Sequence, residues 1–272
     1  MDLILEKVEQ CPICSNKTSN LYKRIDRWEI RQCLCCGLKR LDPRPAELEL
    51  TKLYDKSYFQ ERIPQESKKA SRQMARSFRR RLNIILRYSK GRKLLDAGCG
   101  EGDWLKNAQA HGYDVTGFDI SEEAAKQAKF EIITGPMCKA PIKGTFDIIT
   151  CFHSLEHTQN PIDALNWLSS FLNSDGILLV EVPNCGSYDA QRFDIKWDGW
   201  KLPFHFWHFD KDTLSKALTK TGFKPIFWRF DSSKYIRDRL RKIPIISLTK
   251  GLLGHLKTGT GMLAVSKKAN IL

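Results

Sequence analysis

The sequence lacks any apolar run of about 18 residues, the length that a helix needs to cross a bilayer, so it predicts no membrane span. No secretory leader is expected, because the opening stretch 1–7 mixes acidic residues with a very short apolar segment. Nine cysteines in a chain without a leader favour a reducing compartment, where Cys-x-x-Cys pairs hold metal more often than disulfides. We therefore expect a cytoplasmic protein.

Acidic residues are scarce beside basic ones: 45 Lys and Arg against 31 Asp and Glu give a formal net charge of +14. This balance predicts affinity for nucleic acid, an anionic membrane surface or a phosphorylated substrate, without choosing among them. Between Lys68 and Lys93 there are eleven basic residues and no acid. Apolar residues recur there at helical spacing, which predicts a helix with one packed face and a positively charged remainder. They are Met74, Phe78, Leu82 and Ile85.

The chain has 272 residues and three regions of different texture. Residues 1–45 are rich in cysteine and turn formers, and residues 46–90 have a helical pattern. Residues 91–272 alternate short apolar runs with helical patterns, which is typical of a parallel sheet with crossover helices. The sequence therefore predicts a doubly wound α/β domain behind a small N-terminal module. The expected strands are 93–96, 114–119, 146–152, 177–182, 223–230 and 262–266.

Helix start and stop signals separate these strands. Ser121 and Asp210 are residue types that cap helix N-termini. A turn at Asp175-Gly176 is expected between a helix and the strand that follows it.

A glycine-rich turn, Asp96 to Gly102 (DAGCGEG), follows the first of these strands and precedes an expected helix. Glycines let the backbone turn tightly and let a ligand approach without meeting a Cβ atom. Free N–H groups at the start of the helix favour an anionic group such as a carboxylate. Asp119, at the end of the next strand, is suited to accept both hydroxyls of a ribose.

The rival interpretation of this turn is a dinucleotide site, whose fingerprint is G-x-G-x-x-G. Asp103 occupies the position of the third glycine in that fingerprint, and Asp96 lies two residues before the first glycine. An extra carboxylate suits a cationic ligand, such as a sulfonium-bearing amino acid with an ammonium group, better than a pyrophosphate.

Four cysteines of the N-terminal region have the spacing C-x2-C-x18-C-x2-C. They are Cys11, Cys14, Cys33 and Cys36. Two such knuckles bring four thiolates to tetrahedral positions around one zinc ion, and bound metal would supply the folding energy of so short a segment. The alternatives are unliganded thiols or a redox pair, and the neighbouring Cys35 could shift the register. We predict a structural zinc site.

Several segments resemble class I S-adenosylmethionine-dependent methyltransferases. LLDAGCGEG at 94–102 resembles their first motif, FDIITCFHSLEH at 146–157 their fourth strand, and ILLVEVPN at 177–184 their fifth. The resemblance implies a Rossmann-like, mostly parallel seven-stranded sheet whose last strand is antiparallel. It spans residues 91–272 and is closest to the ubiquinone, menaquinone and glycan-modifying methyltransferases. The ribbon with LDPRP at 41–45 is similar to the opening of a bacterial group from sugar and surface-polysaccharide pathways.

The resemblance implies S-adenosylmethionine as the cofactor and assigns residues to it. The glycine-rich turn should line its methionine part, Asp119 should hold the ribose, and Ile120 should lie against the adenine. Relatives often have an acid near the adenine amine, but this chain has none there, so Met137 or Cys138 is expected instead. The complete expected set is Asp96, Gly98, Cys99, Gly100, Gly102, Asp119, Ile120, Met137, Cys138, Phe152 and His153.

Histidines follow the fourth and fifth expected strands, at the edge where ligands bind in doubly wound sheets. A neutral imidazole there could take a proton from the acceptor as the methyl group arrives. The candidate bases are His205 first, then His157 and His153. The alternative role for His157 is to cap or orient its turn, and the Glu156-His157 pair alone offers too few ligands for a metal site.

The segment around His205 departs from sugar C-methyltransferases, in which Tyr-x-Glu-His supplies the base. This chain has LPFH at 202–205, so the histidine matches while the Tyr and Glu do not, which favours O- or N-transfer. Aromatic residues crowd the same segment and would either stack on an acceptor ring or roof the cofactor pocket. They are Trp197, Trp200, Phe204, Phe206 and Trp207.

The sequence thus predicts a methyltransferase for a small-molecule, sugar or lipid-linked glycan acceptor. Its expected parts are a zinc ribbon (1–45), a basic helical linker (46–90) and the cofactor domain (91–272). A basic amphipathic insert at about 231–258 would rest on the inner face of an anionic membrane, or serve as a solvated dimer or lid element. The alternatives are a zinc-ribbon rRNA methyltransferase, which the charge suits, and a non-catalytic docking module, against which the intact glycine turn stands.

Overall fold

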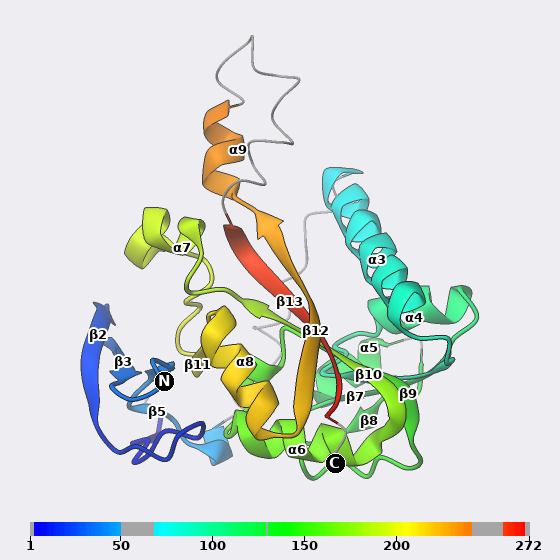
Figure 1. Ribbon diagram of the computed structural model, residues 1–272, viewed down its shortest axis with the longest axis horizontal. Coiled ribbons are helices and arrows are strands. Elements are labelled where there is room, and N and C mark those ends of the chain that lie inside the picture. Colours follow the sequence, from blue (N-terminus) through cyan, green and yellow to red (C-terminus); the bar gives the residue numbers. More distant parts are fainter. Residues whose placement is uncertain (1–2, 50–67, 129, 241–257, 270–272) are drawn as a thin grey trace. The chain divides into compact units, whose positions relative to one another are not determined.

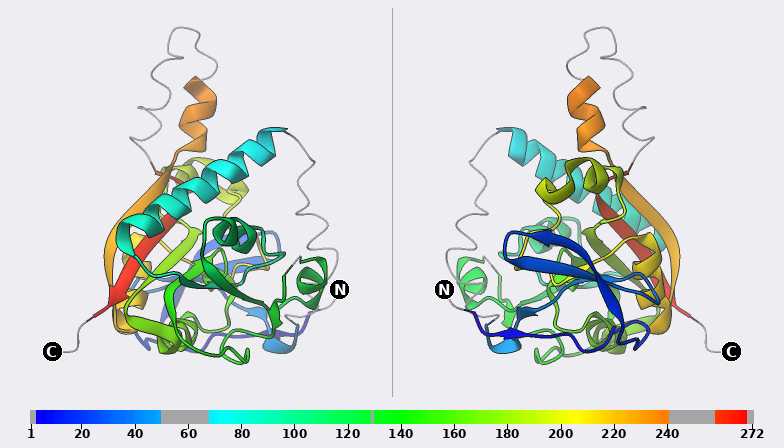
Figure 2. Two further views of the ribbon diagram at one scale, coloured as in Figure 1. Left: turned by 90° about the vertical axis from the view of Figure 1, so that its right-hand side faces the viewer. Right: turned by 90° about the vertical axis from the view of Figure 1, so that its left-hand side faces the viewer.

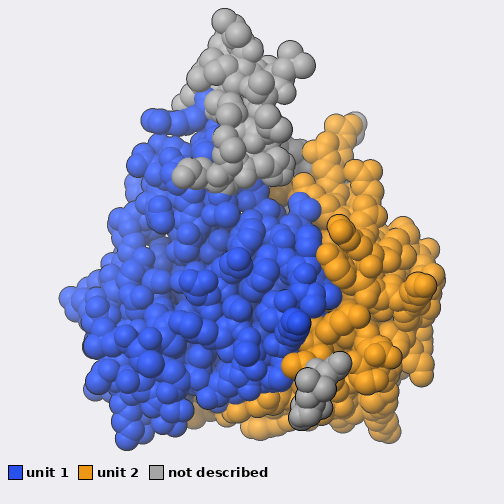
Figure 3. Space-filling view, viewed as in Figure 1, with its two compact units in different colours: residues 1–46, 153–162, 180–266 blue, residues 47–152, 163–179, 267–272 orange. Residues whose placement is uncertain are grey.

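The computed structural model describes residues 3–49, 68–128, 130–240 and 258–269. Its strands form sheets of two, four and seven strands (Figure 1). The chain consists of two compact units, which Figure 3 colours separately. Unit 1 comprises Met1–Ala46, His153–Ile162 and Val180–Ser266, and unit 2 comprises Glu47–Phe152, Asp163–Leu179 and Lys267–Leu272.

The seven-stranded sheet has the order β12-β13-β10-β9-β6-β7-β8 and is mostly parallel, with an antiparallel last strand. Its members are β6 (Lys93–Ala97), β7 (Asp114–Asp119), β8 (Ile133–Thr134), β9 (Phe146–Phe152), β10 (Leu172–Pro183), β12 (Phe223–Ser232) and β13 (Thr258–Lys268). The Rossmann-like α/β fold expected from the sequence is therefore confirmed, and each expected strand is present. Only β8 was missed, because two residues are too few to show a periodic pattern.

The helices begin largely where the cap residues predict. α5 (Glu122–Gln127) starts after Ser121, whose hydroxyl accepts from Ala124 N at 3.1 Å. α8 (Lys211–Lys220) starts after Asp210, whose carboxylate accepts from Thr213 N at 2.9 Å. The other helices are α3 (Lys68–Tyr88), α4 (Asp103–Ala110), α6 (Pro161–Phe171), α7 (Tyr188–Phe193) and α9 (Lys234–Leu240), with 3-10 turns η1 (Glu47–Glu49), η2 (Leu155–His157) and η3 (Asp194–Lys196). Within the described ranges, no helix is long and apolar enough to cross a membrane.

Two local expectations are wrong. The turn expected at Asp175-Gly176 lies inside β10, which already begins at Leu172. Gly176 allows the Leu172 side chain to pack closely against the strand backbone, because a Cβ atom on it would lie 2.7 Å from Leu172 Cδ1. In α3, Met74 does not belong to the packed face: it is 44% exposed, whereas Leu82 and Ile85 are buried, so only the C-terminal half of this helix is embedded.

The N-terminal region folds around a four-stranded sheet with the order β11-β4-β3-β2. The strands β2 (Ser19–Ile25) and β3 (Trp28–Cys33) form a hairpin, drawn in blue in Figure 2, and β4 (Lys39–Leu41) pairs with β3. The fourth strand, β11 (Trp207–His208), comes from far along the chain and pairs with β4. β1 (Leu5–Glu6) and β5 (Arg44–Pro45) form the two-stranded sheet. The N-terminal region thus shares its four-stranded sheet with the segment that follows β10.

The aromatic segment belongs to the core of unit 1. Trp197 and Trp200 pack with Ile30 of β3, and both indoles are 3% exposed. Phe206 and Trp207 are buried as well. These four rings therefore do not present a face on which an acceptor ring could stack, which corrects one of the two interpretations offered for them. Residues 241–257 of the expected basic insert lie outside the described residues.

Candidate functional site

The glycine-rich turn sits at the carboxyl end of β6, beside the ends of its two parallel neighbours β7 and β9. Gly98, Gly100 and Gly102 have φ angles of 77°, 55° and 80°, a region that glycine enters without steric cost. Gly98 N and Cys99 N both donate to Phe118 O of β7, at 2.9 and 3.1 Å. The turn is therefore fixed against the strand that ends in Asp119.

Asp119 is aligned by two backbone hydrogen bonds. Its Oδ2 accepts from Gly100 N at 2.7 Å and its Oδ1 from Ser121 N at 2.9 Å. A carboxylate has about four lone-pair positions, so each of its oxygens can accept from more than one donor. A Cβ atom on Gly100 would meet nothing within 4 Å, which leaves open space on this side of the turn. These residues fit a ribose-bearing cofactor.

Asp96 is a second, more deeply buried carboxyl at this turn, only 3% exposed. Thr150 of β9 donates to its Oδ1 at 2.6 Å. Burial raises the pKa of Asp96 to about 7, with a contribution from the negative charge of Asp119, although the Thr150 hydrogen bond and the charge of Arg81 act in the opposite direction. The carboxyl would ionise readily beside a ligand cation, because a nearby positive charge favours the charged form.

The remaining expected cofactor residues of unit 2 follow or end neighbouring strands of the same sheet, whereas His153 belongs to unit 1. β8 pairs with β7, and Gly135 N donates to Asp119 O at 3.0 Å, which ties the Met137-Cys138 segment to the end of β7. Met137 and Ile120 are half-buried, and Cys138 is exposed. Phe152 ends β9, under the guanidinium of Arg81, which lies 3.9 Å from its ring centroid. Burial raises the pKa of the Cys99 thiol, so this side chain is a neutral neighbour of the turn.

Glu156 is the centre of a group of histidines in unit 1. Its carboxylate is fully buried, and its Oε1 lies 3.6 Å from His153 Nδ1 and 3.9 Å from His205 Nε2. The rings of His157 and His205 meet edge to face, with centroids 4.6 Å apart. We call Glu156 with His153, His157 and His205 the imidazole cluster. Within the described part of the chain, neither carboxylate oxygen of Glu156 has a hydrogen-bond partner.

The protonation states within the imidazole cluster differ. Burial lowers the pKa of His205 to about 4, although the charge of Glu156 opposes this. Burial would also lower the pKa of His153, but its contacts with Glu156 and Glu181 prevail and raise it to about 9. Burial would raise the pKa of Glu156, but His153 and the charges of the other imidazoles lower it to about 2. At neutral pH the cluster therefore contains an ionised Glu156, a charged His153 and a neutral His205.

Backbone carbonyls determine which ring nitrogens carry protons. His205 Nδ1 lies 2.9 Å from Gly199 O, and His157 Nδ1 lies 3.0 Å from Phe204 O. Because a carbonyl only accepts, Nδ1 donates in both rings, and Nε2 of the neutral ring is the proton acceptor. Of the three candidate bases, His205 has the neutral state that a general base needs. It is largely buried, with 6% of its surface exposed.

Two of the residues that shape this cluster were missed by the sequence analysis as site residues. Glu156 was treated only as a partner of His157, and Glu181 was not considered. The sequence did offer a signal for Glu181, because it is an acid inside an otherwise apolar part of strand β10. In the structure its Oε1 lies 3.7 Å from His153 Nε2. The structure also adds His205 to the Glu156-His157 pair: one ligand atom from each residue lies within 4.8 Å of the others, so the three could hold a metal ion.

The four-stranded sheet β11-β4-β3-β2, which we call the ribbon sheet, supports the segment that carries His205. Leu41 N of β4 donates to Phe206 O at 2.8 Å, and Phe206 N donates to Glu156 O at 2.9 Å. Trp207 Nε1 donates to Thr158 O at 2.6 Å. The backbone on either side of the imidazole cluster is therefore connected to the N-terminal region by hydrogen bonds.

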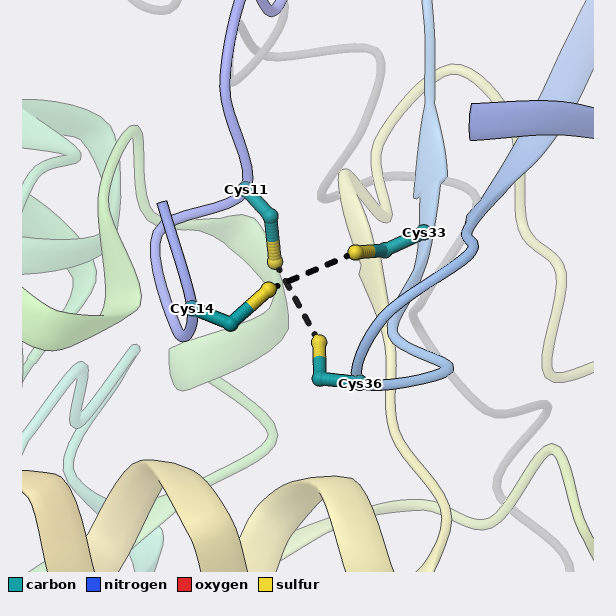
Figure 4. A group of neighbouring side chains, drawn as sticks. All are labelled: Cys11, Cys14, Cys33 and Cys36. Atoms are coloured by element: carbon teal, nitrogen blue, oxygen red, sulfur yellow. Dashed lines mark hydrogen bonds between the residues drawn. The ribbon is translucent and has the colours of Figure 1, made fainter. Parts of the chain in front are cut away.

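The four cysteines expected to bind metal converge in unit 1 (Figure 4). Their sulfurs lie within 4.8 Å of one another, with Cys11–Cys36 at 3.4 Å and Cys14–Cys33 at 3.5 Å. Sulfurs around a tetrahedral zinc ion with bonds of about 2.3 Å would be about 3.8 Å apart, so a small expansion accommodates the ion. Ser15 and Gly37 follow the two knuckles with positive φ angles of 57° and 84°, which turns each chain back over its cysteine pair.

Cys35 is not one of the four converging cysteines, although a side-chain hydrogen bond with Cys14 raises the pKa of its thiol. Its side chain is exposed, and Cys36 occupies the fourth position, as the regular spacing predicts. Burial raises the pKa of Cys11 to about 11. Burial would also raise the pKa of Cys14, but hydrogen bonds with the backbone of Asn16 and with the neighbouring cysteines lower it to about 7. A bound cation would favour the thiolate forms of all four.

Comparisons with known proteins support a methyltransferase that uses S-adenosylmethionine. A family model described as a methyltransferase domain matches residues 68–226. The ubiquinone biosynthesis O-methyltransferase of Vibrio parahaemolyticus is 29% identical over 118 residues, which cover 38% of this chain and 50% of that protein. The corresponding protein of Thiobacillus denitrificans is 34% identical over 82 residues, covering 26% and 35%. The chain spans about half the length or less of these curated relatives.

Solved structures share the fold. Magnesium protoporphyrin IX methyltransferase from Synechocystis PCC 6803, with bound S-adenosylhomocysteine, has a TM-score of 0.59 at 14% identity and covers 82% of this chain and all of its own. A SAM-dependent methyltransferase from Archaeoglobus fulgidus has a TM-score of 0.56 at 20% identity, covering 79% and 100%. The family model matches more than half of the chain. The chain therefore belongs to the class I S-adenosylmethionine-dependent methyltransferases.

Proposed function

We propose that this chain transfers a methyl group from S-adenosylmethionine to the oxygen or nitrogen of a small molecule, a sugar or a lipid-linked glycan in the cytoplasm. The observation that carries the proposal is the alignment of Asp119 by Gly100 N and Ser121 N, beside open space at a glycine-rich turn. The curated relatives are O-methyltransferases, and a structural neighbour from Burkholderia thailandensis is an N1-methyltransferase with bound 1,6-didemethyltoxoflavin. Both names support a small acceptor.

The residues of the chain have distinct tasks in this proposal. When bound, S-adenosylmethionine supplies the methyl group on its sulfonium. Asp119 holds the ribose hydroxyls, Asp96 faces the positive charge of the amino acid part, and Gly98 and Gly100 let the ligand approach the backbone. Positioning of this kind accounts for much of the rate enhancement in group transfer.

His205 is proposed as the base that takes the acceptor proton. Its neutral form and its unprotonated Nε2 support this role, and ionised Glu156 would stabilise the imidazolium that results. Zinc at the four cysteines is proposed as a structural ion. The departures from the C-methyltransferase pattern at 202–205 support O- or N-transfer.

Replacing His205 with Asn tests the base. The Asn amide can still donate to Gly199 O, but no Nε2 remains, so we expect kcat for methyl transfer to fall about 100- to 10,000-fold. The affinity for S-adenosylhomocysteine should stay unchanged, since its ligands lie elsewhere. His111→Asn, at an exposed histidine, is the matched control and should behave as wild type. A full rate in the His205→Asn variant would contradict the assigned role.

The acceptor class is tested with S-adenosylmethionine that carries a labelled methyl group. Small-molecule, glycolipid and RNA fractions of a bacterial extract are incubated with the protein, and the label in each is counted. We expect it in the small-molecule or glycolipid fraction. Label in RNA alone would favour an rRNA methyltransferase, which the net charge of +14 also suits.

A further inference from the structure

Helix α3 carries a row of five arginines on one side. Successive residues of a helix are rotated by about 100°, so positions 72, 76, 79, 80 and 87 fall within an arc about 100° wide. At about 1.5 Å per residue the row extends over about 22 Å. All five side chains are exposed. We call Arg72, Arg76, Arg79, Arg80 and Arg87 the arginine face.

The arginine face is not neutralised by the residues described around it. α3 contains no acidic residue, and none of the five arginines forms an ion pair within the described ranges. Arg72 and Arg76, and Arg76 and Arg80, are four residues apart, where like charges destabilise a helix. Repulsion among the five arginines therefore destabilises the helix unless an anionic partner compensates their charge.

The opposite side of α3 anchors the helix in unit 2. Leu82, Ile84 and Ile85 are buried there, and Phe78 lies 5.8 Å from the ring of Trp104. Arg81 points to this side as well, over Phe152. The helix therefore presents the arginine face to solvent in a fixed orientation.

The chemistry of the arginine face selects a phosphate-bearing partner. A guanidinium binds phosphate oxygens in a bidentate manner, and a straight row of five suits an array of phosphates. Leu86, 59% exposed, lies about 20° beyond Arg79 at the edge of the arc and offers an apolar contact. The arc contains no aromatic ring on which a base could stack, as single-stranded RNA recognition requires.

We propose that the arginine face docks the chain on the anionic headgroups of a lipid bilayer. The negative potential of an anionic membrane surface attracts basic side chains, and a helix lying in the interface adds apolar contacts. This docking does not depend on methyl transfer. It would bring the chain to the surface on which lipid-linked acceptors lie.

Vesicle sedimentation tests the proposal with the whole 272-residue, zinc-loaded chain. The probes are vesicles of phosphatidylcholine alone and vesicles in which about one third of the lipid is phosphatidylglycerol. We expect binding to the anionic vesicles only, and its loss at about 0.5 M salt, where charges are screened within a few Å. Replacing all five arginines of the arginine face with Gln should weaken binding by at least about 100-fold.

A second quintuple variant removes the same charge elsewhere. It replaces five exposed lysines with Gln: Lys106, Lys126, Lys143, Lys220 and Lys224. Binding of this variant should stay within about fivefold of wild type. Equal losses in the two variants, or no binding of wild type to anionic vesicles, would overturn the proposal. Binding to single-stranded RNA through the arginine face without binding to vesicles would overturn it too. Retained affinity for S-adenosylhomocysteine confirms that each variant is folded.

Discussion

Replacing Asp119 with Ala is expected to weaken the binding of S-adenosylmethionine about 100- to 10,000-fold. Each hydrogen bond from a ribose hydroxyl to the carboxylate contributes about 1.5–3 kcal/mol, and each 1.4 kcal/mol corresponds to a factor of ten. The substitution also removes the acceptors of Gly100 N and Ser121 N, so the glycine-rich turn loses its alignment. Isothermal titration calorimetry measures the change directly.

Two further variants identify the cause of this loss. Asp119→Asn keeps the size and one carbonyl acceptor but removes the charge, so its affinity should lie between those of wild type and Asp119→Ala. Asp114→Ala removes an exposed Asp at the start of the same strand, β7, and should bind as wild type does. Wild-type affinity in Asp119→Ala would contradict the assigned ribose site.

Replacing Cys36 with Ser is expected to abolish zinc binding and to reduce methyl transfer by at least about 100-fold. Metal-binding energy is folding energy in so small a segment, so the ribbon sheet should lose its order without the ion. β4 would then no longer support Phe206 and the backbone of Glu156. Cofactor affinity should remain within about twofold of wild type, because its expected ligands, except His153, belong to unit 2.

Cys35→Ser is the matched control for this variant. Cys35 is exposed and lies outside the four-thiol cluster, so zinc content and activity should not change. Zinc content is measured by elemental analysis and activity by transfer of a labelled methyl group. Full activity in Cys36→Ser would show that the ribbon is dispensable for catalysis and would favour a role in docking partners.

Local patterns in the sequence predict the large sheet well. Strand β7 is correct to the residue, because its apolar residues are bounded by turn signals, and Ser121 caps the next helix as expected. The glycine-rich turn and the cysteine pairs are also local, since their geometry depends on residues a few positions apart. These features need no knowledge of distant contacts.

The pairing of β11 with β4 could not be predicted in this way. A two-residue strand has no periodicity, and its partner lies far away in the chain. The central position of Glu156 depends on the same distant contacts, because His205 reaches it only after Phe206 is fixed by β4 and by the backbone of Glu156. Sequence spacing placed histidines after two strands but could not show that one buried carboxylate joins them.

Calorimetric titration of the zinc-loaded wild-type chain with S-adenosylhomocysteine tests the central claim most directly. The account predicts one site per chain with a dissociation constant on the order of micromolar, and competition by S-adenosylmethionine. A folded, zinc-loaded protein that releases no heat with either ligand would contradict it, and would leave the chain as a docking module on a methyltransferase fold.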